Sequence, residues 1–149
     1  MGAIFGLGDK MKVEIMYAGK ATKVKSIIDA MAKDVKTHIK SIHEYSHEVN
    51  DLVVLAFDDS FKSDQELKQF IQSLHRDQVK NLCLVCTFYH SNKKMEKVIE
   101  LCQRQRLPLL REQYAVKLPL FSNKAIPNSC IDSGRIYIDN MVTIVQQYY

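Results

Sequence analysis

DLVVLAF, at residues 51–57, is the stretch that decides the fold of this chain. Its apolar side chains follow one another almost without a break, whereas a strand with one solvated face alternates apolar and polar residues. A second run of this kind, NLCLVCTF at 81–88, lies within a strand that we predict over 79–88. Strands of this type are buried on both faces, so they predict a parallel sheet covered by helices on both sides.

The stretch before the first of these runs predicts a strand, a tight loop and a helix. KVEIMYA at 12–18 is rich in strand-forming residues and ends at Gly19. Apolar residues then recur at helical spacing, which predicts a helix with one buried face. They are Val24, Ile27, Ile28, Met31 and Val35.

Three further helices are predicted along the chain. Ser63 and Glu66 form a capping-box pattern at the start of the first, and Ser91 or Asn92 can cap the second. The last runs from about residue 133 to 148. Their buried stripes are Leu67, Phe70, Ile71 and Leu74; Met95, Val98, Ile99 and Cys102; and Ile138, Met141, Val142 and Val145.

Two weaker patterns complete the sheet. Residues 38–45 predict a second strand at an edge, and residues 107–118 contain the fifth strand, followed by a loop over 119–133. Five strands alternating with helices predict parallel pairing through right-handed crossovers. The fold class is therefore α/β, a three-layer doubly wound sandwich with a five-stranded parallel sheet.

Length and composition are those of one globular domain, which we place at residues 12–149. The chain has 149 residues, of which 46% are hydrophobic and 26% charged. Residues 1–11 are predicted to be a flexible leader. Their apolar part is far shorter than the roughly 20 residues that a membrane span requires, so no membrane span is expected.

Cysteine usage and charge limit the compartment and the partners. The four cysteines lie inside or beside apolar runs and no export signal precedes them, which favours the reducing cytoplasm. The net charge of +4 is mild, and the lysines are spread over several predicted helices. This distribution argues against nucleic acid as a partner; strong salt dependence of binding would support it.

KVEIMYAGKATKVKSIIDAM at 12–31, together with DLVVLAF and NLCLVCTF, resembles the flavodoxin-like family. The resemblance implies non-covalent binding of flavin mononucleotide (FMN) and electron transfer to or from a redox partner protein, a carrier or accessory role more than that of a stand-alone enzyme. It assigns the phosphate to the loop after the first strand. In this chain that loop is Gly19, Lys20, Ala21, Thr22 and Lys23.

The same resemblance assigns the isoalloxazine ring to the loops after the third and fourth strands. The matching residues are Asp59, Ser60, Phe61, Thr87, Tyr89 and His90. Phe61 and Tyr89 are the expected ring walls, because aromatic side chains at loop tips can stack on a planar heterocycle.

The chain departs from the family pattern in two respects. The phosphate loop is shortened and keeps one hydroxyl, Thr22, and the net charge is positive, whereas flavodoxins that serve as mobile carriers are acidic. The shortened loop favours an alternative function, a flavin-free accessory or interaction module on the same fold. The positive charge favours an acidic partner.

Other motifs give no catalytic residue and no metal site. Cys83 and Cys86 form CxxC within a strand, where residues three apart point to opposite faces, so we interpret them as core residues. His43 and His47 lack the HExxH order of a zinc site and are interpreted as solvated loop residues. A receiver-like Mg²⁺ site is disfavoured, because Tyr17 and Ala18 stand where carboxylates would be needed.

Overall fold

The computed structural model describes residues 11–119 and 126–148. The predicted leader, apart from Met11, lies outside the described residues. Met11 itself is partly buried and packs against the core. Within the described ranges, no helix is long and apolar enough to cross a membrane.

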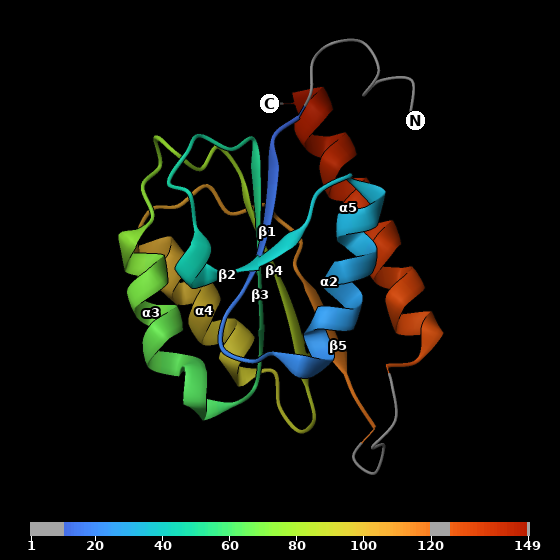
Figure 1. Ribbon diagram of the computed structural model, residues 1–149. Helices are drawn as coiled ribbons and strands as arrows, with labels where there is room; N and C mark the ends of the chain where they lie inside the picture. The colour runs from blue at the N-terminus through green and yellow to red at the C-terminus, as the bar shows by residue number, and fades with distance from the viewer. Residues whose placement is uncertain (1–10, 120–125, 149) are drawn as a thin grey trace.

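Five parallel strands form one sheet in the order β2-β1-β3-β4-β5 (Figure 1). The strands are β1 (Val13–Tyr17), β2 (Ile39–Ser41), β3 (Leu52–Asp58), β4 (Leu82–Phe88) and β5 (Tyr114–Lys117). The two continuous apolar runs became the centre of the sheet: β3 pairs with β1 and β4, and Leu52 to Phe57 are all buried. This architecture confirms the predicted five-stranded parallel sheet.

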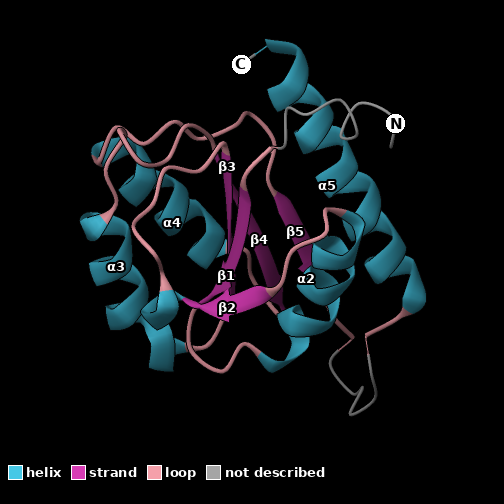
Figure 2. Ribbon diagram, turned by 45° about the horizontal axis from the view of Figure 1, so that its top comes forward, coloured by secondary structure: helices cyan, strands magenta, loops and turns pink. Residues whose placement is uncertain are grey.

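Helices cover both faces of the sheet (Figure 2). On one face lie α2 (Thr22–Asp34) and α5 (Asn128–Tyr148), which pack on each other and share a core with that face. On the other face lie α3 (Asp64–Ser73) and α4 (Lys93–Arg104), with a core of their own. The predicted three-layer sandwich is confirmed.

The CxxC cysteines lie on opposite faces of β4, as predicted. Cys83 belongs to the core beneath α2 and α5, whereas Cys86 belongs to the core beneath α3 and α4. Burial raises the pKa of both thiols to about 12. Protonated thiols on two sides of a sheet form neither a redox pair nor a metal site.

The predicted second strand ends earlier than expected. It stops at Ser41, which begins a 3₁₀ turn, η1 (Ile42–Glu44), by accepting a hydrogen bond from the amide of His43. Glu44 accepts from the amide of Ser41 in return, completing a capping box. The strand does lie at the sheet edge, as predicted. The crossover to β3 contains no α-helix over 42–51, and Tyr45 packs into the core there.

Two further predicted boundaries were wrong. Helix α5 begins at Asn128 instead of about residue 133, because Cys130 and Ile131 donate hydrogen bonds to the carbonyl of Pro127 and extend the helix backwards. Strand β4 begins at Leu82 rather than at residue 79. Val79 forms only an isolated bridge to Asn50.

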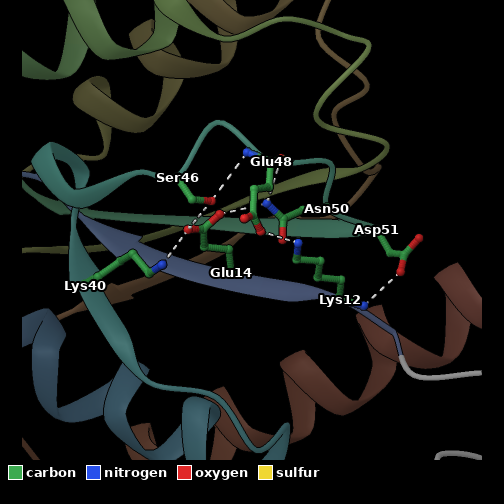
Figure 3. Close-up of polar contacts among 7 residues, drawn as sticks. All are labelled: Lys12, Glu14, Lys40, Ser46, Glu48, Asn50 and Asp51. Atoms are coloured by element: carbon green, nitrogen blue, oxygen red, sulfur yellow. Dashed lines mark hydrogen bonds and ion pairs between the residues drawn. The ribbon is translucent and has the colours of Figure 1, made fainter.

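A buried carboxylate fixes this helix-free crossover (Figure 3). Glu14, the second residue of β1, is only 5% exposed and accepts a 2.7 Å hydrogen bond from the side-chain amide of Asn50. The ammonium of Lys40 in β2 lies 2.7 Å from its other oxygen, and the hydroxyl of Ser46 lies 3.4 Å away. One side chain of β1 therefore holds β2 and the segment that follows it.

Candidate functional site

A pocket of ≈ 500 Å³ opens at the carboxyl edge of the sheet, where the loops after β1 and β3 meet. Such an edge is where open parallel sheets bind ligands, because loops from several strands converge there. The lining residues are Gly19, Lys20, Ala21, His43, Asp58, Ser60, Lys62, Ser63 and Glu66. We call this pocket the groove.

Gly19 lets the two loops approach closely. Its φ of +63° is left-handed, and a Cβ built at this position would lie 2.8 Å from the Cβ of Ser63. Both observations require glycine, because a side chain would be strained and would collide with the start of α3. The sequence pattern identified this tight loop but gave no indication of the contact with Ser63.

The start of α2 faces the groove through Ala21, its N-cap residue. Ala21 is left-handed and buried, no side chain caps this helix end within the described residues, and the first turn carries no acidic residue. The helix dipole favours an anion at such an end. Of the predicted loop residues, Gly19, Lys20 and Ala21 line the groove, whereas Thr22 is exposed and neither it nor Lys23 is among the lining residues.

The lining carries charges of both signs. Lys20 and Lys62 bring two ammonium groups, and Asp58 and Glu66 bring two carboxylates. Both carboxylates have partners: Asp58 accepts a 3.0 Å hydrogen bond from the amide of Ser60, and Glu66 lies 3.2 Å from Nε2 of His43. The lysines have no ion pair within the described ranges and so remain available to an anionic ligand.

Several lining residues were not predicted as site residues. Asp58 ends β3, while Ser63 and Glu66 were interpreted as a helix cap. In the structure Ser63 makes no capping hydrogen bond. His43 reaches the groove because η1 brings the end of β2 beside α3. Its position depends on the crossover, and the S-x-x-E pattern of Ser41 and Glu44 is the local signal that could have indicated this turn.

The residues predicted to hold the ring divide into two groups. Ser60 lines the groove, and Phe61, in the 3₁₀ turn η2 (Phe61–Ser63), is 88% exposed beside it. Thr87 is 1% exposed and faces the interior, Tyr89 is half-buried, and His90 is exposed; none of the three lines the groove. Asp59 joins the two loops by accepting a 2.9 Å hydrogen bond from the amide of Tyr89.

A lysine of α4 joins this helix to the loop after β3. The ammonium of Lys94 donates to the carbonyl of Ser60 at 2.7 Å and to the hydroxyl of Ser63 at 3.3 Å. It also lies 2.7 Å from a carboxylate oxygen of Asp64. Nothing in the sequence distinguishes Lys94, because it is one of several lysines in the same helix.

The described part of the chain contains no set of side chains that could bind a metal ion. No group of three or more His, Cys, Asp or Glu side chains is placed there to hold an ion. The histidines are spread out, and His43, the one that reaches the groove, pairs with Glu66.

Comparison with known proteins identifies the architecture. No family model matches the chain, and no curated protein matches its sequence. Among solved structures, a flavodoxin from the domain Archaea aligns with a TM-score of 0.72 at 8% identity, over 92% of this chain and 100% of that one. Oxidised flavodoxin 1 from Bacillus cereus aligns at 0.68 and 11% identity, over 89% and 97% of the two chains.

A larger protein contains the same unit. Rubredoxin oxygen:oxidoreductase from Desulfovibrio gigas aligns with a TM-score of 0.68 at 11% identity, and this chain covers 37% of it. Identities this low establish the arrangement of elements and not the activity. On the order of its strands and these structural likenesses, the chain has a flavodoxin-like fold.

Proposed function

We propose that this protein binds FMN non-covalently at the groove and passes electrons to or from a partner protein. The observation that carries the proposal is the convergence, at one pocket, of the uncapped start of α2 with the ammonium groups of Lys20 and Lys62. Backbone donors, a helix dipole and two cations suit a phosphate dianion. The volume of ≈ 500 Å³ also falls within the roughly 300–1,000 Å³ of small-molecule sites.

Residues of this chain fit the phosphate end of the cofactor. Gly19 and Ala21 shape the turn so that the backbone of the loop lies against the groove, and Lys20 adds charge from the same loop. Ser60 and Ser63 present hydroxyls from the opposite wall. These two hydroxyls offset the loss of hydroxyls in the shortened first loop, which keeps only Thr22.

The ring would lie toward the loops after β3 and β4, where Phe61 and Tyr89 offer aromatic faces. Phe61 is solvent-exposed and can stack on a planar ligand, and the backbone amide of Tyr89 donates a hydrogen bond to the carboxylate of Asp59. The flavin supplies the redox chemistry when it is bound. The chain supplies the anchor, the orientation and the partial exclusion of water.

The partner of such a carrier would present an acidic surface. The chain has 21 basic and 17 acidic side chains, and Lys20 and Lys62 at the carboxyl edge are exposed. Complementary charge accelerates and orients encounter between electron-transfer partners. We place this exchange in the cytoplasm, because all four cysteines are free thiols.

A flavin-free accessory module is the second candidate function. The observation that favours it is that the two ring-binding loops are already joined to each other by the hydrogen bond from the amide of Tyr89 to the carboxylate of Asp59. A planar ring placed between the loops would have to replace this contact. In that case the carboxyl edge would serve as a protein-docking surface.

Fluorescence titration with FMN and with riboflavin tests the proposal, since the two ligands differ only in the phosphate. We expect FMN to bind at least about tenfold more tightly, as an anchored phosphate would add more than about 1.4 kcal/mol. Equal affinities would refute the phosphate anchor. Absence of binding by either ligand would leave the accessory module as the function of this fold.

A further inference from the structure

Lys94 does not line the groove but holds the wall that does. Its side chain is 13% exposed, and its ammonium uses three acceptors, the carbonyl of Ser60, the hydroxyl of Ser63 and the carboxylate of Asp64. An ammonium group has three donors, so its hydrogen-bonding capacity is fully used. All three acceptors lie within residues 60–64, where the chain leads from β3 into the first turn of α3.

The segment that Lys94 holds supplies a large part of the groove. Ser60, Lys62 and Ser63 line it, and two of these three are direct partners of the ammonium. Ser63 lies against Gly19, where a Cβ would be only 2.8 Å from its own. The position of Lys94 is therefore transmitted through Ser63 to the loop proposed to bind phosphate.

The contacts at Ser63 show that the sequence preference of this serine is overridden. Ser63 lies at the N-cap of α3 with Glu66 three residues on, yet its hydroxyl accepts from Lys94 and caps nothing. A side-chain cap stabilises a helix start, so the partner that replaces it must contribute comparably. A hydrogen bond from a charged donor does so.

We propose that Lys94 is a positioning residue of the groove: it sets the spacing between the wall formed by residues 60–63 and the loop at Gly19, and thereby the strength of phosphate binding. This inference rests on the proposed function, because it concerns the same site. It assigns to α4 a part in phosphate recognition although α4 does not line the groove. The affected ligand group is the phosphate and not the ring.

The test compares Lys94→Met with Lys93→Met, a matched control on the same helix whose exposed side chain has no ion pair within the described residues. The measured quantity is the ratio of the riboflavin to the FMN dissociation constant, which isolates the phosphate. We expect Lys94→Met to lower this ratio about tenfold, the effect of losing about 1.4 kcal/mol. Lys93→Met should leave it unchanged, and Lys94→Arg, which keeps the charge, should restore most of it.

A merely structural role gives a different result. If Lys94→Met lowers the melting temperature but leaves the ratio unchanged, the proposal is overturned. Should Lys94→Met not fold, Asp64→Asn replaces one of the three acceptors, an exposed carboxylate, by a neutral amide and should lower the ratio by a smaller factor. An unchanged ratio in a folded Asp64→Asn protein would likewise count against Lys94.

Hydrogen exchange separates this inference from the proposed function. Lys94→Met should accelerate amide exchange over residues 60–64 by about tenfold in the ligand-free protein, because the ordered wall loses its anchor. If neither ligand binds even the unmodified protein, the proposed function fails while faster exchange still supports the positioning role. Unchanged exchange over these residues would overturn it.

Discussion

Glu14 and Asn50, 36 residues apart in the sequence, are joined by a 2.7 Å hydrogen bond in the interior of the protein (Figure 3). The carboxylate of Glu14 lies at a buried position of β1, where an apolar side chain would be expected. The side-chain amide comes from Asn50, just before β3 begins. Lys40 and Ser46 occupy the rest of the carboxylate. This network replaces the packing that a crossover helix would supply.

Replacing Glu14 should destabilise the fold. In Glu14→Leu the amide of Asn50 and the ammonium of Lys40 lose their acceptor, so the free energy of unfolding should fall by about 2 kcal/mol. Urea denaturation measures the change. Glu48→Gln is the control, because its ion pair with Lys12 is exposed and should contribute nothing measurable. Equal stability of Glu14→Leu and the unmodified protein would show that the network is dispensable.

Reversing the charge of Lys20 should weaken the phosphate anchor. Lys20→Glu places a carboxylate in the groove and should raise the FMN dissociation constant about tenfold or more, with little effect on riboflavin. Lys33→Glu makes the same change of net charge in the last turn of α2 and should leave FMN affinity unchanged. Equal losses in both variants would mean that only the overall charge matters.

The two aromatic candidates should differ in their effects on the fold. Phe61 is 88% exposed, so Phe61→Ala should leave the melting temperature unchanged and alter the spectrum of bound flavin if the ring stacks there. Tyr89 packs against the core, so Tyr89→Ala should lower stability somewhat, but it should perturb the flavin spectrum more than the fold. A flavin spectrum unaffected by both changes would place the ring elsewhere.

The buried thiols should make the protein sensitive to alkali. Burial raises the pKa of Cys83, Cys86 and Cys102 from 9.0 to about 12 in the folded state. Above pH 9.0 the unfolded chain therefore releases protons that the folded chain retains, so stability should fall as pH rises toward 12.

Urea midpoints at about pH 8 and about pH 10 measure this loss. Thiol labelling of the native protein at neutral pH provides an independent check, because the thiolate is the reactive form. Half-buried Cys130 should react first, and the three buried thiols only on unfolding. Rapid labelling of Cys83 would contradict the burial on which the pH dependence rests.

Local patterns determined the sheet and its helices. The continuous apolar runs of β3 and β4 are shielded from water only when helices cover both faces of the sheet. The apolar stripes of α2, α3 and α4 are buried for the same reason, with residues spaced at the helical period. The opposite placement of Cys83 and Cys86 also followed, because successive side chains alternate along any strand. Burial of apolar surface is encoded residue by residue and needs no knowledge of distant partners.

Tertiary structure decided which polar groups meet. From sequence alone Ser63 and Glu66 form a helix cap, yet Ser63 bonds to Lys94, Glu66 pairs with His43, and the capping box forms at Ser41 and Glu44 instead. The capping box of Ser41 and Glu44 joins residues only three apart, but the other two contacts join residues 23 and 31 positions apart and depend on how the crossover and α4 approach α3. A hydrogen bond is short and directional, so its partner is fixed only after the apolar elements have packed and brought distant donors within reach. The chain by itself therefore determined the layers of this protein, and the packed fold determined the groove.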